Sequence, residues 1–488
     1  MSDAEVRKLS YGAKLGFGVG QFGEGVCRVV FGTYMLFFYN QVIGISATLT
    51  GIALAIALVF DAISDPVAGS ISDRWKSKWG RRHPFITGSA IPLALSIIAL
   101  FNPPGEMHEL FYFGWLTLFA VAARLFLTLY HVPHMALGAE MAHEYSDRTR
   151  VYSYSELFGT IGSAGFAFLV LTYIFPSIEG ASHGMLNEAG YPPFSMTAGA
   201  TIIITILLCA WGTRKEIPYL PSWDVTEERL SLGRLWREVR TALGSRSYRM
   251  LLCGLLSAML LLSYEGSLMV YIYVHFWELP TESMRWLGPA ALIALPISAA
   301  MTPPLTRMFD KRTILLCFGS ITIINMNLMI MLRLFTPFTP DNGDPMLLYM
   351  LLGVAFFSGL VGPALMITFN SMFADVADEL ELRTGGRQEG MIFSARSFSF
   401  KASGALATVI GGIALDLIAF PRAAEAGAVP AEIVFRLGVV AGPVTLVLGL
   451  LAMLFYLAYQ LDRKRMAEIR DELAKRRAAQ HTGGQRPD

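Results

Sequence analysis

The stretch Phe60–Pro84, FDAISDPVAGSISDRWKSKWGRRHP, decides how the rest of the chain is interpreted. It follows an almost wholly apolar segment from Thr48, so Asp61 and Asp65 fall where the chain is still expected to lie in lipid. Residues four apart on a helix share one face, about one turn apart. A charge at membrane depth costs at least about 2.5 kcal/mol, so such residues usually line a polar cavity and handle ions or protons. The stretch therefore predicts a membrane protein that binds a cation within its span.

The second half of the same stretch is a basic loop. Pro66 and Gly69 loosen the helix, and five Lys or Arg side chains then lie within the nine residues from Arg74 to Arg82. Dense positive charge is typical of loops on the cytoplasmic side of a membrane. Further basic clusters alternate along the chain with connections that carry no Lys or Arg, so both termini are predicted to be cytoplasmic.

Composition supports a membrane protein. Of the 488 residues 54% are hydrophobic and 16% are charged, whereas soluble domains have about 25% charged residues. With about 20 apolar residues for each span, we expect an all-α integral membrane protein with twelve transmembrane helices. The net charge of +1 gives no reason to expect a nucleic-acid partner. Four cysteines in apolar segments indicate core positions and no disulfide framework.

A weak internal repeat predicts two six-helix halves. Glu140-Met-Ala-His-Glu closes the fourth span as Asp375-Val-Ala-Asp-Glu closes the tenth. Equivalent loops in equivalent places indicate parallel halves related about an axis along the membrane normal, which is the major facilitator architecture. We expect an N-terminal bundle over 1–211, a cytoplasmic linker over 212–247 with a surface helix around Thr226–Leu243, a C-terminal bundle over 248–461, and a cytoplasmic tail over 462–488.

Two long motifs resemble those of a known family, the glycoside–pentoside–hexuronide:cation symporters, whose best-known member is the melibiose carrier. The first motif runs from Asp61-xxx-Asp65-Pro66-xx-Gly69 through Asp73 to Lys78-Trp79-Gly80-Arg81-Arg82-xx-Phe85-Ile86. The second is Ala374-Asp375-xx-Asp378-xx-Glu381-x-Arg383-Thr384-Gly385-x-Arg387-x-Glu389-Gly390. Both lie in the loops where the family has them, and the resemblance extends over the whole chain.

The resemblance implies a cation site at Asp61 and Asp65, with Ser64 and Thr128 as further ligands. The chemistry is consistent with this, because a hard cation such as Na⁺ takes oxygen ligands and two nearby carboxylates raise one another's pKa enough to hold a proton. Lys401 matches a family lysine near the cation and sugar sites. The alternative is that the two aspartates only bind helix ends or basic side chains. Apart from a possible bound Na⁺, no metal or cofactor is expected.

The substrate site departs from that of the melibiose carrier. Gly25 and His131 stand where that carrier has sugar-binding aspartates, and Glu156 replaces an arginine, so melibiose is not the expected substrate. Arginine suits bidentate contacts with carboxylates and phosphates, so the charges within the spans predict a polar, acid-bearing substrate. The alternative is that they pair among themselves, Glu24 with Arg28 and Glu265 with a cation of span eleven. The candidate substrate contacts are Glu24, Arg28, Arg124, His131, Glu156, Tyr264, Glu265, Arg396 and Lys401.

We therefore expect a transporter and not an enzyme. It would couple Na⁺ or H⁺ to symport of a glycoside, sugar or sugar acid by alternating access, as a monomer surrounded by lipid in a bacterial inner membrane. Ion pairs would latch the cytoplasmic face in the outward-open state. A sodium-dependent lysophospholipid-type carrier of the same fold stays open as an alternative, as does an integral-membrane enzyme. The gating candidates are Asp73, Arg74, Arg81, Arg82, Arg148, Asp375, Asp378 and Arg387.

Overall fold

The protein is a bundle of long helices. The computed structural model describes residues 9–142, 144–177, 183–220, 240–384 and 389–483. Over these ranges no strand occurs, and eleven helices are long and apolar enough to cross a membrane. The run from Tyr11 to Val42, the first in the chain, brings the number of spans to the predicted twelve, so the predicted fold class is confirmed. Arg387 and most of the predicted surface helix Thr226–Leu243 lie outside the described ranges.

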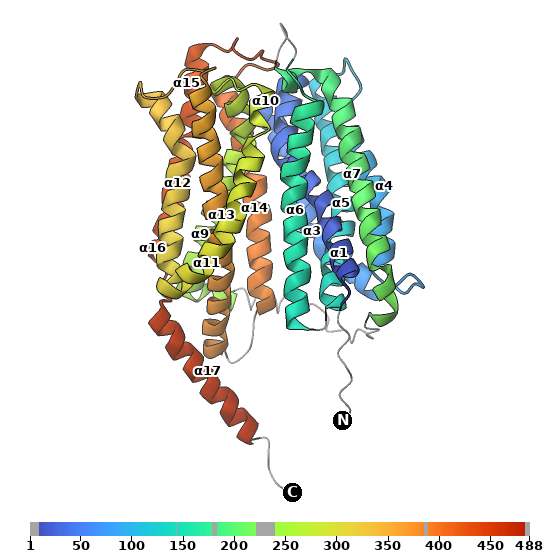
Figure 1. Ribbon diagram of the computed structural model, residues 1–488, viewed down its shortest axis with the longest axis vertical. Coiled ribbons are helices and arrows are strands. Elements are labelled where there is room, and N and C mark those ends of the chain that lie inside the picture. Colours follow the sequence, from blue (N-terminus) through green and yellow to red (C-terminus); the bar gives the residue numbers. More distant parts are fainter. Residues whose placement is uncertain (1–8, 143, 178–182, 221–239, 385–388, 484–488) are drawn as a thin grey trace.

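The helices form two groups that lie side by side (Figure 1). The first group is the run α1 (Tyr11–Val29), η1 (Val30–Tyr34), α2 (Met35–Phe37) and η2 (Phe38–Val42), then α3 (Ala47–Arg74), α4 (His83–Leu100), α5 (Glu109–Met141), α6 (Tyr145–Tyr173) and α7 (Tyr191–Thr213). The second is α9 (Arg246–Tyr271) with η6 (Ile272–Phe276), α10 (Thr281–Met284), α11 (Leu287–Met308), α12 (Lys311–Phe335), α13 (Pro345–Thr384), α14 (Glu389–Leu417), and α15 (Ala431–Ala441) with α16 (Pro443–Leu457).

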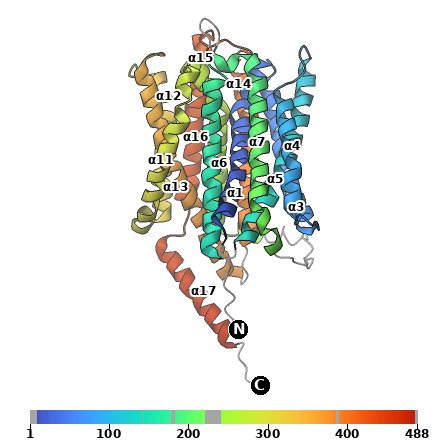
Figure 2. The ribbon, with the colours of Figure 1, turned by 45° about the vertical axis from the view of Figure 1, so that its right-hand side comes forward.

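Both chain termini lie at one end of the bundle, which we call the terminal face; the opposite end is the far face (Figure 1). A last helix, α17 (Arg463–Gly483), projects from the terminal face, as Figure 2 shows. Several helices begin at a serine whose hydroxyl accepts a hydrogen bond from the first turn, as Ser46 does from the Leu49 amide of α3. Pro66 sits inside α3 directly after Asp65 and lacks an amide hydrogen, so the helix is weakened next to the aspartates.

The two halves pack closely where α3 meets α14 near the far face. A Cβ atom on Gly412 would lie 2.2 Å from the Ala47 carbonyl oxygen, and one on Gly51 would lie 2.3 Å from that of Thr408. Contacts this short exclude any side chain, so glycine allows the two backbones to touch. The same two helices carry the charged residues of the candidate site.

Candidate functional site

A partly buried charge cluster joins the two halves. Asp61 and Asp65 project from α3 in the first half, and Lys401 projects from α14 in the second. The Lys401 ammonium lies 2.9 Å from Asp61 Oδ2 and 2.5 Å from Asp65 Oδ2. With both carboxylates ionised, Lys401 neutralises one of the two negative charges. The Asp61 side chain is 10% exposed and that of Asp65 is 38% exposed, so Asp65 is the more accessible of the two.

Hydroxyl groups complete the oxygen set around the carboxylates. Thr128 Oγ1, on α5, lies 2.8 Å from Asp61 Oδ1 and 3.1 Å from Asp65 Oδ1. A hydroxyl has one hydrogen, so it donates to one carboxylate at a time. Ser64 Oγ lies 3.2 Å from Thr128 Oγ1 and 3.1 Å from the Asp61 carbonyl. The four residues of the predicted cation site are therefore brought together, with Lys401 among them.

A second polar cluster connects α1, α5 and α6. Arg28 Nε and Nη2 each donate to Glu24 at 3.1 Å, so these two residues make the pairing that the sequence left open as an alternative, and the contact is bidentate. Arg28 Nη1 also lies 4.0 Å from Glu156, and His131 Nδ1 lies 3.8 Å from Glu24. The side chains of Arg28 and Glu156 are 46% and 74% exposed. Glu24, Arg28, His131 and Glu156 thus form one group of alternating charge.

Two of the predicted arginines have no carboxylate partner within the described ranges. The Arg124 guanidinium lies 4.3 Å from the centre of the Phe31 ring, and that of Arg396 lies 5.2 Å from the Phe400 ring. The Nε atoms of both are buried and lack a hydrogen-bond acceptor among the residues described. Stacking on an aromatic face holds a guanidinium in place and leaves its donors available.

Tyr264 and Glu265 on α9 do not join either cluster. Tyr264 is buried in the second half, where its hydroxyl donates to the Val440 carbonyl at 3.3 Å. The alternative pairing of Glu265 with a cation of α14 is wrong for Lys401, because that side chain lies between Asp61 and Asp65. Arg396, the other candidate cation of α14, likewise makes no ion pair with Glu265 in the part of the chain described here. Glu265 instead lines a separate cavity.

At the terminal face, the predicted gating residues of the first half pair within that half. Arg82 is buried, donates to Glu140 and Ser72, each at 2.7 Å, and forms an ion pair with Asp73. Arg81 reaches the same Glu140 oxygen at 3.0 Å. Arg74 and Arg148 are exposed at this end.

The second half repeats this arrangement. Lys311, the first residue of α12, lies 2.5 Å from Asp375 near the end of α13. This pair corresponds to Arg82 with Glu140, since in each half a basic residue at the start of a helix reaches the acid that begins the repeated motif. Arg470 of α17 lies 3.2 Å from Asp375 and 3.8 Å from Asp378.

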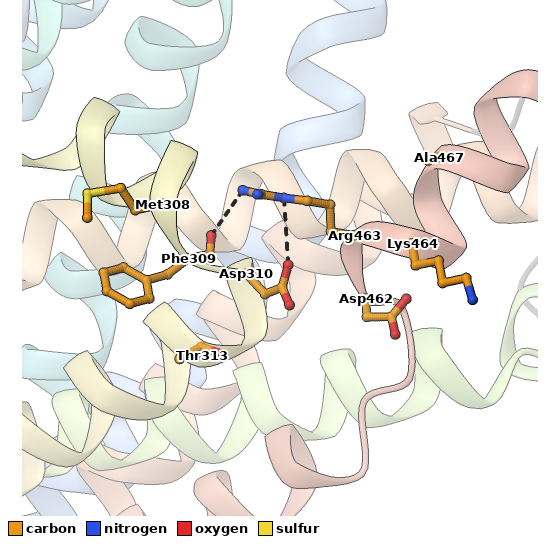
Figure 3. A pocket seen from close by; sticks show the side chains of 8 residues that line it. All are labelled: Met308, Phe309, Asp310, Thr313, Asp462, Arg463, Lys464 and Ala467. Carbon is orange, nitrogen blue, oxygen red and sulfur yellow. Dashed lines mark hydrogen bonds and ion pairs between the residues drawn. The ribbon is translucent and has the colours of Figure 1, made fainter.

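Helix α17 docks on the second half of the bundle. Its Met466, Ile469 and Leu473 side chains are buried in a cluster with residues of α13. At its start Arg463 donates to the carbonyls of Thr306 and Arg307 at 3.1 and 2.9 Å. Figure 3 shows the Arg463 guanidinium reaching across to Phe309 and Asp310 at the end of α11. The predicted cytoplasmic tail is therefore an extension of the second half, held by both apolar and charged contacts.

Contacts between the halves at the far face involve residues that the sequence patterns did not single out. Asp416, in the last turn of α14, accepts hydrogen bonds from the Ser46 hydroxyl at 2.6 Å and the Thr48 amide at 2.9 Å. It thereby caps the start of α3, a helix of the other half. Glu282 accepts from the Ser177 amide and hydroxyl, both at 2.8 Å. The sequence does show an acid at the end of an apolar span, but it does not show the partner of that acid, which is distant in sequence.

His183 makes a further contact across the far face. Its Nε2 lies 2.8 Å from the Leu279 carbonyl, and its Nδ1 accepts from the Met185 amide at 3.3 Å. This pattern requires the neutral ring with hydrogen on Nε2. Burial lowers the pKa of His183, with the Leu279 carbonyl and Glu282 acting in the opposite direction. The closed far face thus favours neutral histidine.

We predict that acid pH weakens this closure. A histidine released into water has a pKa of about 6.5, so opening is coupled to proton uptake, and the closed population falls as pH drops through that value. Spin labels at Met107 and Phe338, exposed residues of the two halves, report the opening as a longer distance. His183→Gln keeps a donor for the Leu279 carbonyl without titrating. A pH response of equal size in that variant would contradict the assignment.

The comparisons with known proteins agree with the fold. A family model described as "MFS/sugar transport protein" matches residues 16–463. The isoprimeverose transporter of Lactiplantibacillus pentosus is 20% identical, over 96% of this chain and 93% of that protein. The sodium-dependent lysophosphatidylcholine symporter 1-A of Danio rerio is 24% identical, over 94% of this chain and 87% of its own length.

A solved structure shows the same fold. The xylose transporter of Escherichia coli in its inward open conformation superposes with a TM-score of 0.59 at 12% identity, covering 94% of this chain and 98% of that one. Because the family model covers nearly the whole helical bundle, this chain belongs to the MFS/sugar transport protein family, and is a multi-pass membrane transporter rather than an enzyme.

Proposed function

We propose that the protein is a secondary active transporter that couples a monovalent cation, Na⁺ or H⁺, to symport of a glycoside, sugar or sugar acid. The observation that carries this proposal is the oxygen cluster of Asp61, Asp65, Ser64 and Thr128 with the Lys401 ammonium among its members. Carboxylates and hydroxyls are suitable ligands for a hard cation. The ammonium stands in the place that a coupling cation would take.

Competition between Lys401 and the cation provides a mechanism of coupling. Two carboxylates and one ammonium leave one negative charge, so one monovalent cation or proton makes the cluster neutral. An entering cation takes carboxylate oxygens from Lys401 and weakens a contact between the two halves. A carboxylate on the substrate then offers the freed ammonium a new partner. Binding of the cation and the substrate would thereby favour one another, and the loaded carrier would change conformation as a unit.

The free arginines support an acid-bearing substrate. Arg124 is stacked on Phe31, has buried Nε without an acceptor, and makes no ion pair in the part of the chain described here. A bidentate contact with a substrate carboxylate would satisfy it. A phosphate would do so as well, and one relative is named a lysophosphatidylcholine symporter, so a lysophospholipid stays the second candidate substrate.

The charges at the terminal face support a bacterial inner-membrane protein with both termini in the cytoplasm. Arg81, Arg82, Lys311, Arg463 and Arg470 all lie at that end of the helices. Clusters of Lys and Arg near the ends of spans mark the cytoplasmic side. With the contacts across the far face made, the structure then corresponds to the carrier closed toward the outside. We propose that it works as a monomer.

Asp65→Asn tests the coupling in proteoliposomes. The amide cannot bind a proton or balance a cation, so we predict that uptake of a labelled uronate or glycoside no longer exceeds equilibration in a Na⁺ or pH gradient. Exchange without a gradient should persist, because the substrate contacts are intact. Asp341→Asn, an exposed acid in the loop before α13, is the matched control. Accumulation in Asp65→Asn as high as in the unchanged protein would refute the cation site.

Arg124→Gln tests the substrate class. A hydrogen bond to a charged group contributes about 1.5–3 kcal/mol, so uronate uptake should fall about tenfold or more, with a much smaller effect on the matching neutral glycoside. The two substrates are compared in the same vesicles. An equal loss for both would show that Arg124 does not contact the acid. Uptake of lysophosphatidylcholine alone would instead support the second candidate.

A further inference from the structure

A separate cavity of about 590 Å³ lies between the halves, lined mainly by helices of the second half and on one side by α1, η1 and α6 of the first. This volume is within the range of about 300–1,000 Å³ that is typical of small-molecule sites. Most of the residues that line it are leucine, isoleucine, valine, methionine or alanine. Neither the aspartate pair nor Lys401 belongs to it, so it is distinct from the candidate cation site.

Glu265 is the single charged residue among those that line this cavity. It lies on α9, between Tyr264 and the apolar turn that contains Leu268 and Met269. No hydrogen bond or ion pair joins its carboxylate to another residue of the described ranges. An ionised carboxylate without a partner at membrane depth costs several kcal/mol, so this group either takes up a proton or is stabilised by a positively charged ligand.

The rest of the wall limits what that partner can be. Sugars need several hydrogen-bonding groups, whereas the lining of this cavity is mainly apolar. Tyr34 and Tyr273 present aromatic rings, which attract organic cations. Five methionines, at positions 185, 269, 284, 326 and 329, give a wall that adapts to irregular apolar shapes.

We propose that this cavity binds an organic cation whose charge is embedded in an apolar body, with the Glu265 carboxylate as its counter-ion. The apolar body fills the space between α9, α11 and α13, and the aromatic rings and the carboxylate select positive charge. The cavity begins, on α1, at Val29, directly after Arg28, and on α6 at Thr160, one turn after Glu156. A ligand would therefore pass the polar cluster before it enters. This site goes beyond sugar symport and does not depend on it.

Tetraphenylphosphonium and tetraphenylborate test the proposal, because they have nearly the same size and shape and opposite charge. Binding of each to the purified full-length protein in nanodiscs is measured by equilibrium dialysis, with empty nanodiscs as the blank. We expect saturable binding of tetraphenylphosphonium and none of tetraphenylborate. Saturable binding of both with similar affinity would show an apolar cavity without charge selection and would overturn the proposal.

Two variants locate the site, and a third serves as the control. Glu265→Gln keeps the shape of the side chain and should weaken tetraphenylphosphonium binding by about tenfold or more, which corresponds to about 1.4 kcal/mol. Glu432→Gln, an exposed acid on α15 that pairs with Arg436, should leave binding unchanged. Ala355→Trp fills the cavity from α13 while Glu265 itself is unchanged, and should also reduce binding. Each variant is first checked for unaltered helix content and a single elution peak.

The opposite results are equally clear. If Glu265→Gln binds tetraphenylphosphonium as tightly as the unchanged protein, the carboxylate is not the counter-ion. If lysophosphatidylcholine alone binds saturably, the cavity accepts a lipid chain and not a compact cation. Either result overturns the proposal while leaving the uptake experiments on Asp65 unaffected.

Discussion

The contact on which the account depends is the Lys401 ammonium held between the carboxylates of Asp61 and Asp65. A charged group in a membrane span is costly unless it is paired, and here the partners come from helices of different halves. The same two helices touch backbone to backbone near the far face, where Gly51 and Gly412 leave no room for a side chain. A charge that enters this cluster therefore acts on the main seam of the molecule.

The two ends of the bundle use different chemistry. At the terminal face, strong ion pairs stay within each half, Arg82 with Glu140 and Lys311 with Asp375, and Arg470 of α17 adds to the second. At the far face, the halves are joined by helix caps and carbonyl contacts, such as those of Asp416 and His183. At one end the acid–base pairs can exchange partners, and at the other end the contacts are short and polar. This arrangement fits a carrier in which the two halves rock about a central site.

Much of this could be predicted from the sequence. The apolar spans, the alternation of basic loops and the repeated acid motif are local patterns, and they led to the twelve-helix, two-half architecture. The meeting of these side chains was also predictable, because Asp61 and Asp65 are one turn apart on one helix and the family resemblance indicated Thr128 and Lys401. The π-helical segments within the run from Tyr11 to Val42 were not predicted.

The partners of other charges could not be predicted, because they depend on side chains brought together from distant helices. Asp416 caps a helix more than 360 positions away in the chain. Arg124 stacks on an aromatic ring where a carboxylate was the simpler expectation, and Glu265 faces an apolar cavity with no cation of α14 beside it. The sequence shows that these charged residues lie within apolar spans. Only the packing of the helices shows which of them are paired and which remain available for a ligand.

The central claim is that Lys401 and the coupling cation compete for the same two carboxylates. Isothermal titration calorimetry measures the affinity for Na⁺ of the purified protein and of Lys401→Ala. Proton uptake by the same two proteins is measured in two buffers of different ionisation heat. Removal of the competitor should raise the affinity for the coupling cation by about tenfold or more, since the unpaired carboxylates gain most from a new positive charge. An unchanged or weaker affinity in Lys401→Ala would contradict the account.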